Sequence, residues 1–60
     1  MYYIVEVDGK LRQIIDTKGK ANKYGDAKLF KTRKEAEAWT LKHSYKGMSF
    51  YYEIKEYHES

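Results

Sequence analysis

The positive charges between residues 17 and 34 are the clearest chemical feature of the sequence. This stretch holds seven cations and one carboxylate, Asp26, so its local charge is +6, while the rest of the chain carries −3. Lysines bind phosphates by releasing counterions, the free amides at a helix start bind anions, and an aromatic ring can stack on a base. The pattern therefore indicates a site for nucleic acid or for an acidic protein surface, and the alternative is a solvated loop that keeps the chain in solution. The candidate residues are Lys18, Lys20, Lys23, Tyr24, Lys28, Lys31, Arg33 and Lys34.

The other polar residues predict neither catalysis nor a metal centre. The sequence has no cysteine, its only histidines are His43 and His58, and no His/Asp/Glu cluster has the spacing of metal ligands. The serines lack a nucleophile elbow, and the glycines form no phosphate-binding loop. We therefore expect a protein that is not an enzyme and that uses no cofactor and no metal.

The length and the tyrosine content predict one domain, residues 1–60, that pairs with a second copy of itself. A lone core of this size usually needs a disulfide, a metal or a partner chain. Because cysteine is absent, oligomerisation is the expected support, and we predict a homodimer. Seven of the 60 residues are tyrosine, whose apolar ring and polar hydroxyl suit interfaces.

The sequence shows neither a membrane span nor a secretion signal. No window approaches the roughly 18 apolar residues that a membrane helix requires. The segment MYYIVEVDGK at positions 1–10 lacks the basic start, the long apolar run and the cleavage site of a signal peptide. We therefore expect a cytoplasmic protein that does not enter a membrane.

The first quarter of the sequence predicts a β-hairpin with two possible registers. Residues 2–7 are β-branched and aromatic, and Asp8-Gly9 is a strong turn signal before a returning strand. A two-residue turn pairs Val7 with Lys10. A three-residue loop pairs Val7 with Leu11 and gathers more apolar side chains on one face. Turn chemistry favours the first register and patterning favours the second.

A capped helix is predicted in the second half of the chain, after a loop over residues 17–28. Thr32 and Glu35 match a capping box, in which the threonine oxygen accepts from an amide of the first helical turn. The helix is expected to run from Arg33 to about Ser44, with Trp39 as its main apolar anchor.

The last predicted element is a strand over residues 48–57, which completes an α+β fold. The expected architecture is a small antiparallel-dominated sheet of about three strands, in the order β-β-α-β, with one helix packed on one face. The other face then stays open, and tyrosines on it predict a dimer or partner surface. The residues expected on this open face are Tyr2, Ile4, Tyr51 and Tyr57.

The segment 27–39 reads A-x-x-F-x-T-x-x-E-A-x-x-W, between an initial Tyr-Tyr-Ile-Val and a final Tyr-Tyr-Glu-Ile-Lys-Glu. With these ends, most of the chain resembles small uncharacterised proteins encoded by phages and prophages of Gram-positive bacteria. The resemblance implies a factor that binds a host or defence protein. The same segment also resembles the hybrid-binding domain of some ribonucleases H, which implies binding of an RNA–DNA hybrid.

Two functions follow as expectations from these features. The first is a non-enzymatic binding protein, homodimeric and phage-encoded, that inhibits or modulates a host or defence protein. The second is a small basic module that binds duplex or RNA–DNA hybrid through the charged segment 17–34.

Overall fold

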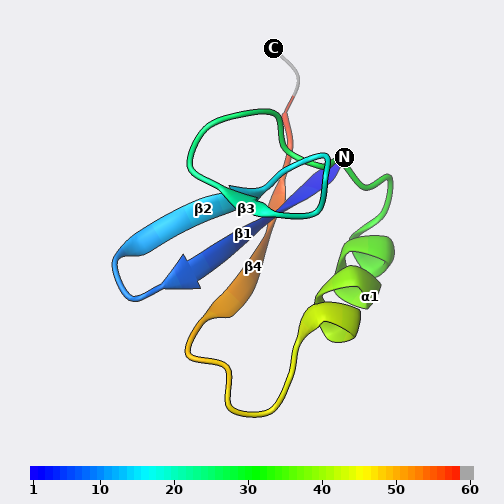
Figure 1. Cartoon of the computed structure of the whole chain (residues 1–60). Helices are drawn as coiled ribbons and strands as arrows, with labels where there is room; N and C mark the ends of the chain where they lie inside the picture. Colours follow the sequence, from blue (N-terminus) through cyan, green and yellow to red (C-terminus); the bar gives the residue numbers. More distant parts are fainter. Residues whose placement is uncertain (59–60) are drawn as a thin grey trace.

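The computed structural model describes residues 1–58 and confirms the α+β class (Figure 1). Within that range, the structure consists of one antiparallel sheet of four strands, in the order β3-β2-β1-β4, and a single helix. The sheet exceeds the expected three strands because β3, two residues long, was not predicted from the sequence. The elements are β1 (Tyr2–Asp8), β2 (Leu11–Ile15), β3 (Ala21–Asn22), α1 (Arg33–His43) and β4 (Tyr51–Glu56).

The β1–β2 hairpin adopts neither of the two predicted registers. Asp8 pairs with Leu11 and Val7 with Arg12, so the turn residues are Gly9 and Lys10. An Asp-Gly turn of type I′ would require positive φ at the aspartate, but within residues 1–58 only glycines have positive φ. Gly9 has a φ of 61°, which fits a type II′ turn with glycine at the first central position.

Asp16 shapes the turn that joins β2 to β3. Its carboxylate accepts hydrogen bonds from the amides of Lys18 at 2.9 Å and Lys20 at 3.0 Å. These bonds stabilise the charged form and lower the pKa of Asp16, with the Lys20 amide as the largest cause. Gly19 follows with a φ of 81°, as in three-residue hairpin loops that end in a left-handed residue. Asp16 and Gly19 together reverse the direction of the chain after β2, so that residues 21–22 can pair with β2 as the short strand β3.

Residues 27–30 bridge β1 and β2 at the end where the two strands no longer pair with each other. Ala27 forms a bridge with Asp16, just after β2, and Phe30 forms a bridge with Tyr2 of β1. Lys28 donates its amide to the carbonyl of Ile15 at 2.9 Å, and Phe30 exchanges two bonds of 2.8 Å with Tyr2. The Phe30 side chain is buried in the core. This segment therefore anchors the end of the loop in the core and closes the sheet at the end opposite the β1–β2 turn.

The helix begins and packs as its sequence predicts. Thr32 is the N-cap, and its hydroxyl accepts from the Glu35 amide at 3.1 Å. Ala36 is fully buried, and the Trp39 ring meets the Tyr52 ring edge-on at 5.3 Å. The His43 ring stacks on the Trp39 ring, with ring centres 3.9 Å apart. These contacts hold α1 against β1 and β4, on one face of the sheet.

The core lies between α1 and the sheet. Its fully or nearly fully buried members are Ile4, Ile15, Phe30 and Ala36, with Tyr2, Ala21, Trp39, Tyr52 and Ile54 packed around them. No helix in the described part of the chain has the length and apolar character needed to span a bilayer.

Candidate functional site: the helix-free face of the sheet

The helix-free face carries the side chains that alternate with those of the core. Val5 and Val7 of β1 point to this face, and both are buried although no helix covers them. Their cover is an ion pair between Arg12 of β2 and Glu53 of β4. Arg12 lies opposite Val7 and Glu53 opposite Val5, so the pair crosses β1 diagonally. The stems of both charged side chains shield the valines from water.

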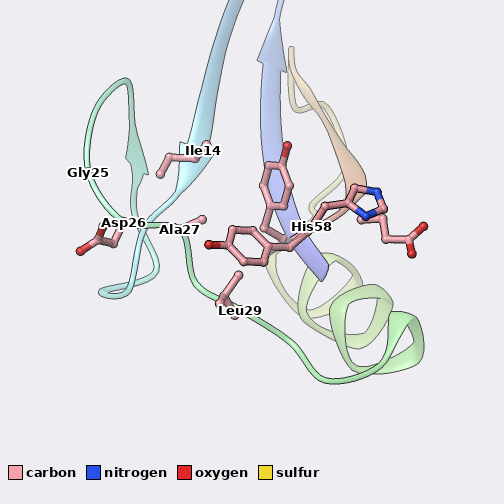
Figure 2. Close-up of a pocket in the computed structure, with 9 residues that line it drawn as sticks. Ile14, Gly25, Asp26, Ala27, Leu29 and His58 are labelled. Carbon is pink, nitrogen blue, oxygen red and sulfur yellow. The ribbon is translucent and has the colours of Figure 1, made fainter. Parts of the chain in front are cut away.

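A cleft of about 610 Å³ opens on the same face, beside residues 25–29 (Figure 2). Ile14 and Leu29 come from separate segments of the chain and lie on one side of the cleft, whereas His58 stands on the other. The rings of Tyr3 and Tyr57 meet edge-on with centres 6.4 Å apart. The lining residues are Tyr3, Ile14, Gly25, Asp26, Ala27, Leu29, Glu56, Tyr57 and His58.

The chemistry of this cleft suits an apolar side chain better than an ion. Figure 2 shows the carboxylate of Asp26 pointing away from the cleft, while Ile14, Ala27 and Leu29 present methyl groups to it. Tyrosine rings add apolar area with a hydroxyl that can bond to a backbone. An aliphatic or aromatic side chain of another protein could therefore be buried here.

The prediction for the open face was right for two tyrosines and wrong for the other two residues. Tyr51 and Tyr57 are 56% and 40% exposed on the helix-free side. Ile4 is 0% exposed and Tyr2 packs beside it, because both point toward α1. The physical reason is strand alternation: Ile4 pairs with Ile54 on the core face, which leaves Tyr3 on the open face.

Of the residues that line the cleft, only Tyr57 was predicted from the sequence, and Tyr3 and Leu29 are the main apolar residues on its wall that were missed. Alternation alone places Tyr3 opposite to Tyr2, but the sequence does not show which of the two faces the helix covers. Leu29 reaches the cleft because residues 27–30 pair between β1 and β2. The only sequence signal for Leu29 was its position next to Phe30. In an extended segment, neighbouring side chains point in opposite directions, so a buried Phe30 places Leu29 on the outside.

The basic segment is folded into two parts of the structure. Lys18 and Lys20 lie in the β2–β3 turn, whereas Arg33 and Lys34 lie in the first turn of α1. Tyr24 is 77% exposed between these parts. Lys28 differs from the others, because it is half-buried with its ammonium group 5.9 Å from the centre of the Phe30 ring. The exposed cations of the segment are Lys18, Lys20, Lys23, Lys31, Arg33 and Lys34.

Within residues 1–58, no three His, Asp or Glu side chains gather in a way that could hold a metal ion. Searches with this sequence and structure found no matching family model, curated protein or solved structure.

Proposed function

We propose that this chain is a non-enzymatic binding domain that recognises another protein through the helix-free face. The observation that carries the proposal is the cleft between Tyr3, Ile14, Leu29 and Tyr57, which is open, apolar and assembled from four segments. The occupant is an aliphatic or aromatic side chain on an exposed segment of the partner. Pockets that bury one such anchor supply most of the affinity of many interfaces.

The partner class follows from the resemblance to small phage and prophage proteins. A phage-encoded factor would act in the host cytoplasm by occupying a host or defence protein, and it would need no cofactor and no catalytic group. The tyrosine-rich surface and the small size of the domain support such a role.

Blocking the cleft is expected to abolish this binding. In Leu29→Glu, a carboxylate replaces an apolar side chain at the cleft wall, so an apolar anchor would have to desolvate a charge. Peptides selected from a displayed random library on the full chain should carry an apolar anchor and bind this variant at least about tenfold more weakly. Affinity is measured by fluorescence anisotropy with the selected peptides.

Leu41→Glu is the matched control, because Leu41 is 77% exposed on α1 and lies outside the cleft. Peptides should bind this control as they bind the natural chain. Selected peptides that bind L29E and the natural chain equally would exclude the cleft as the binding site.

A second candidate function is binding of duplex or RNA–DNA hybrid through the basic segment. The supporting observation is that its exposed cations form no ion pair within residues 1–58 and that the Tyr24 ring is open to solvent. Counterion release would make such binding fall steeply with salt.

Charge reversal tests this second function. Lys20→Glu/Lys23→Glu should weaken binding to duplex, hybrid and single strands, and should reduce the log–log salt slope by about 0.9 for each phosphate that the variant no longer neutralises. The control Lys10→Glu/Lys42→Glu changes the net charge equally but lies outside the segment. Equal losses of affinity in both variants would show that only net charge matters, and salt-independent binding would exclude the function.

A further inference from the structure

β4 forms a long free edge of the sheet. It is the outer strand beside β1, whereas the opposite edge, β3, has only two residues (Figure 1). An outer strand presents unpaired amide and carbonyl groups, to which another strand can add. No backbone bond from a loop or cap occupies these groups among the described residues. The edge of β4 is therefore available to a strand whose side chains fit it.

The direction of the backbone groups on β4 follows from the bonds made at β1. Tyr57 donates its amide to the carbonyl of Met1 at 2.7 Å, while Tyr2 bonds to Phe30 on the other side of β1. Bonded and non-bonded pairs alternate in an antiparallel ladder, so the odd-numbered residues of β4 direct their backbone groups toward β1. The backbone groups that face away from the sheet belong to Tyr52, Ile54 and Glu56.

We propose that the chain forms a two-fold symmetric dimer by antiparallel pairing of β4 with β4 of a second copy, centred on Ile54. In this register Ile54 faces Ile54, and Tyr52 faces Glu56 of the other copy. These are the residues with outward backbone groups, so each pair exchanges both of its hydrogen bonds. The two copies form one continuous sheet with both helices on the same face, and each residue contact occurs twice by symmetry.

The side chains on the helix-free face select this register. Glu53 of one copy lies opposite Lys55 of the other, and the symmetry repeats this pair of opposite charges. Tyr51 lies opposite Tyr57 in the same way. A dimer centred on Glu53 or on Lys55 would instead set two like charges directly opposite each other, which is destabilising. Of the registers centred on residues 53–55, only the one centred on Ile54 pairs opposite charges, and this self-complementarity makes a second copy of this chain the occupant.

The dimer also extends the cleft on the helix-free face. Tyr57 lines the cleft, and Tyr51 of the second copy would lie directly opposite it across the new strand pair. The self-association surface is the strand edge, whereas the proposed protein-binding surface is the sheet face. The two proposals can therefore fail independently.

A charge swap tests the register. In Lys55→Glu, two pairs of carboxylates would oppose each other, and in Glu53→Lys two pairs of ammonium groups would do so. Each variant alone should dimerise about tenfold more weakly than the natural chain. Glu53→Lys also loses the ion pair with Arg12, so circular dichroism first establishes that this variant is folded, and Lys55→Glu tests the register without that change. An equimolar mixture of the two variants restores opposite charges at both positions, so it should form a heterodimer. Sedimentation equilibrium measures the dissociation constants of the natural chain, of each variant and of the mixture. Lys10→Glu is the control for Lys55→Glu, because it changes the net charge by the same amount outside β4.

Several results would overturn the proposal. These are a natural chain that stays monomeric up to about 1 mM, a K55E variant that dimerises like the natural chain, and a mixture that does not restore association. Hydrogen exchange supplies a check that needs no variant, because the amides of Tyr52, Ile54 and Glu56 should gain protection as concentration rises. Unchanged exchange at these amides would also overturn it.

Discussion

Replacing Trp39 with alanine is expected to lower the free energy of unfolding by about 3–5 kcal/mol, which is the range for truncating a large core aromatic. Trp39 is half-buried, but its ring joins the helix to the sheet through Tyr52 and stacks on the His43 ring. A domain of this size has a total stability of about 3–9 kcal/mol. The loss is therefore at least about a third of the total stability, and at the lower end of that range the variant is unfolded at room temperature.

Far-UV circular dichroism during urea unfolding measures this loss, since the variant has no tryptophan left to report by fluorescence. Leu41→Ala is the control, because Leu41 is on the same helix but mostly exposed. It should cost less than about 0.5 kcal/mol. A loss below about 1 kcal/mol for Trp39→Ala would show that the helix is held to the sheet by other contacts.

Replacing Ile4 with alanine should cost about 2–5 kcal/mol, because the side chain is fully enclosed and its removal leaves a cavity. Ile4 touches the centre of the core, with Ile15, Phe30 and Ala36 in the same cluster. Thermal and urea unfolding of the variant measure the loss.

Tyr51→Ala provides the comparison, because the sequence alone placed Ile4 and Tyr51 on the same open face. The structure separates them, with Tyr51 more than half exposed on the opposite side of the sheet. The tyrosine variant should lose much less stability than the isoleucine variant. Similar losses for both would contradict the assignment of faces.

The elements with strong local signals were predictable from the sequence. Thr32 has a hydroxyl to cap the helix, and the amide of Glu35 lies where that hydroxyl accepts a hydrogen bond. Trp39 and Ala36 share one helix face at helical spacing, so the buried side of α1 could be predicted. The last strand was also expected, although it begins at Tyr51 rather than at Met48.

Features that depend on distant pairing could not be predicted in the same way. The alternation in Tyr2–Val7 gives two apolar faces, and only the packing of α1 decides which face becomes the core. The Asp8-Gly9 dipeptide is a turn signal, but the turn moved one residue along to Gly9 and Lys10. For the same reason the cleft was not predicted, since Leu29 joins it only through the bonds of its neighbours to Tyr2 and Ile15.

The position of β1 has a consequence for how the protein is made. β1 precedes the other strands of this sheet in the chain, yet one of its two neighbours is β4, whose residues are translated about fifty positions later. The nascent chain therefore leaves the β4-facing edge of β1 unpaired until residues 51–56 have left the ribosome. Folding is completed only after that point, so this domain matures after most of its translation rather than during it.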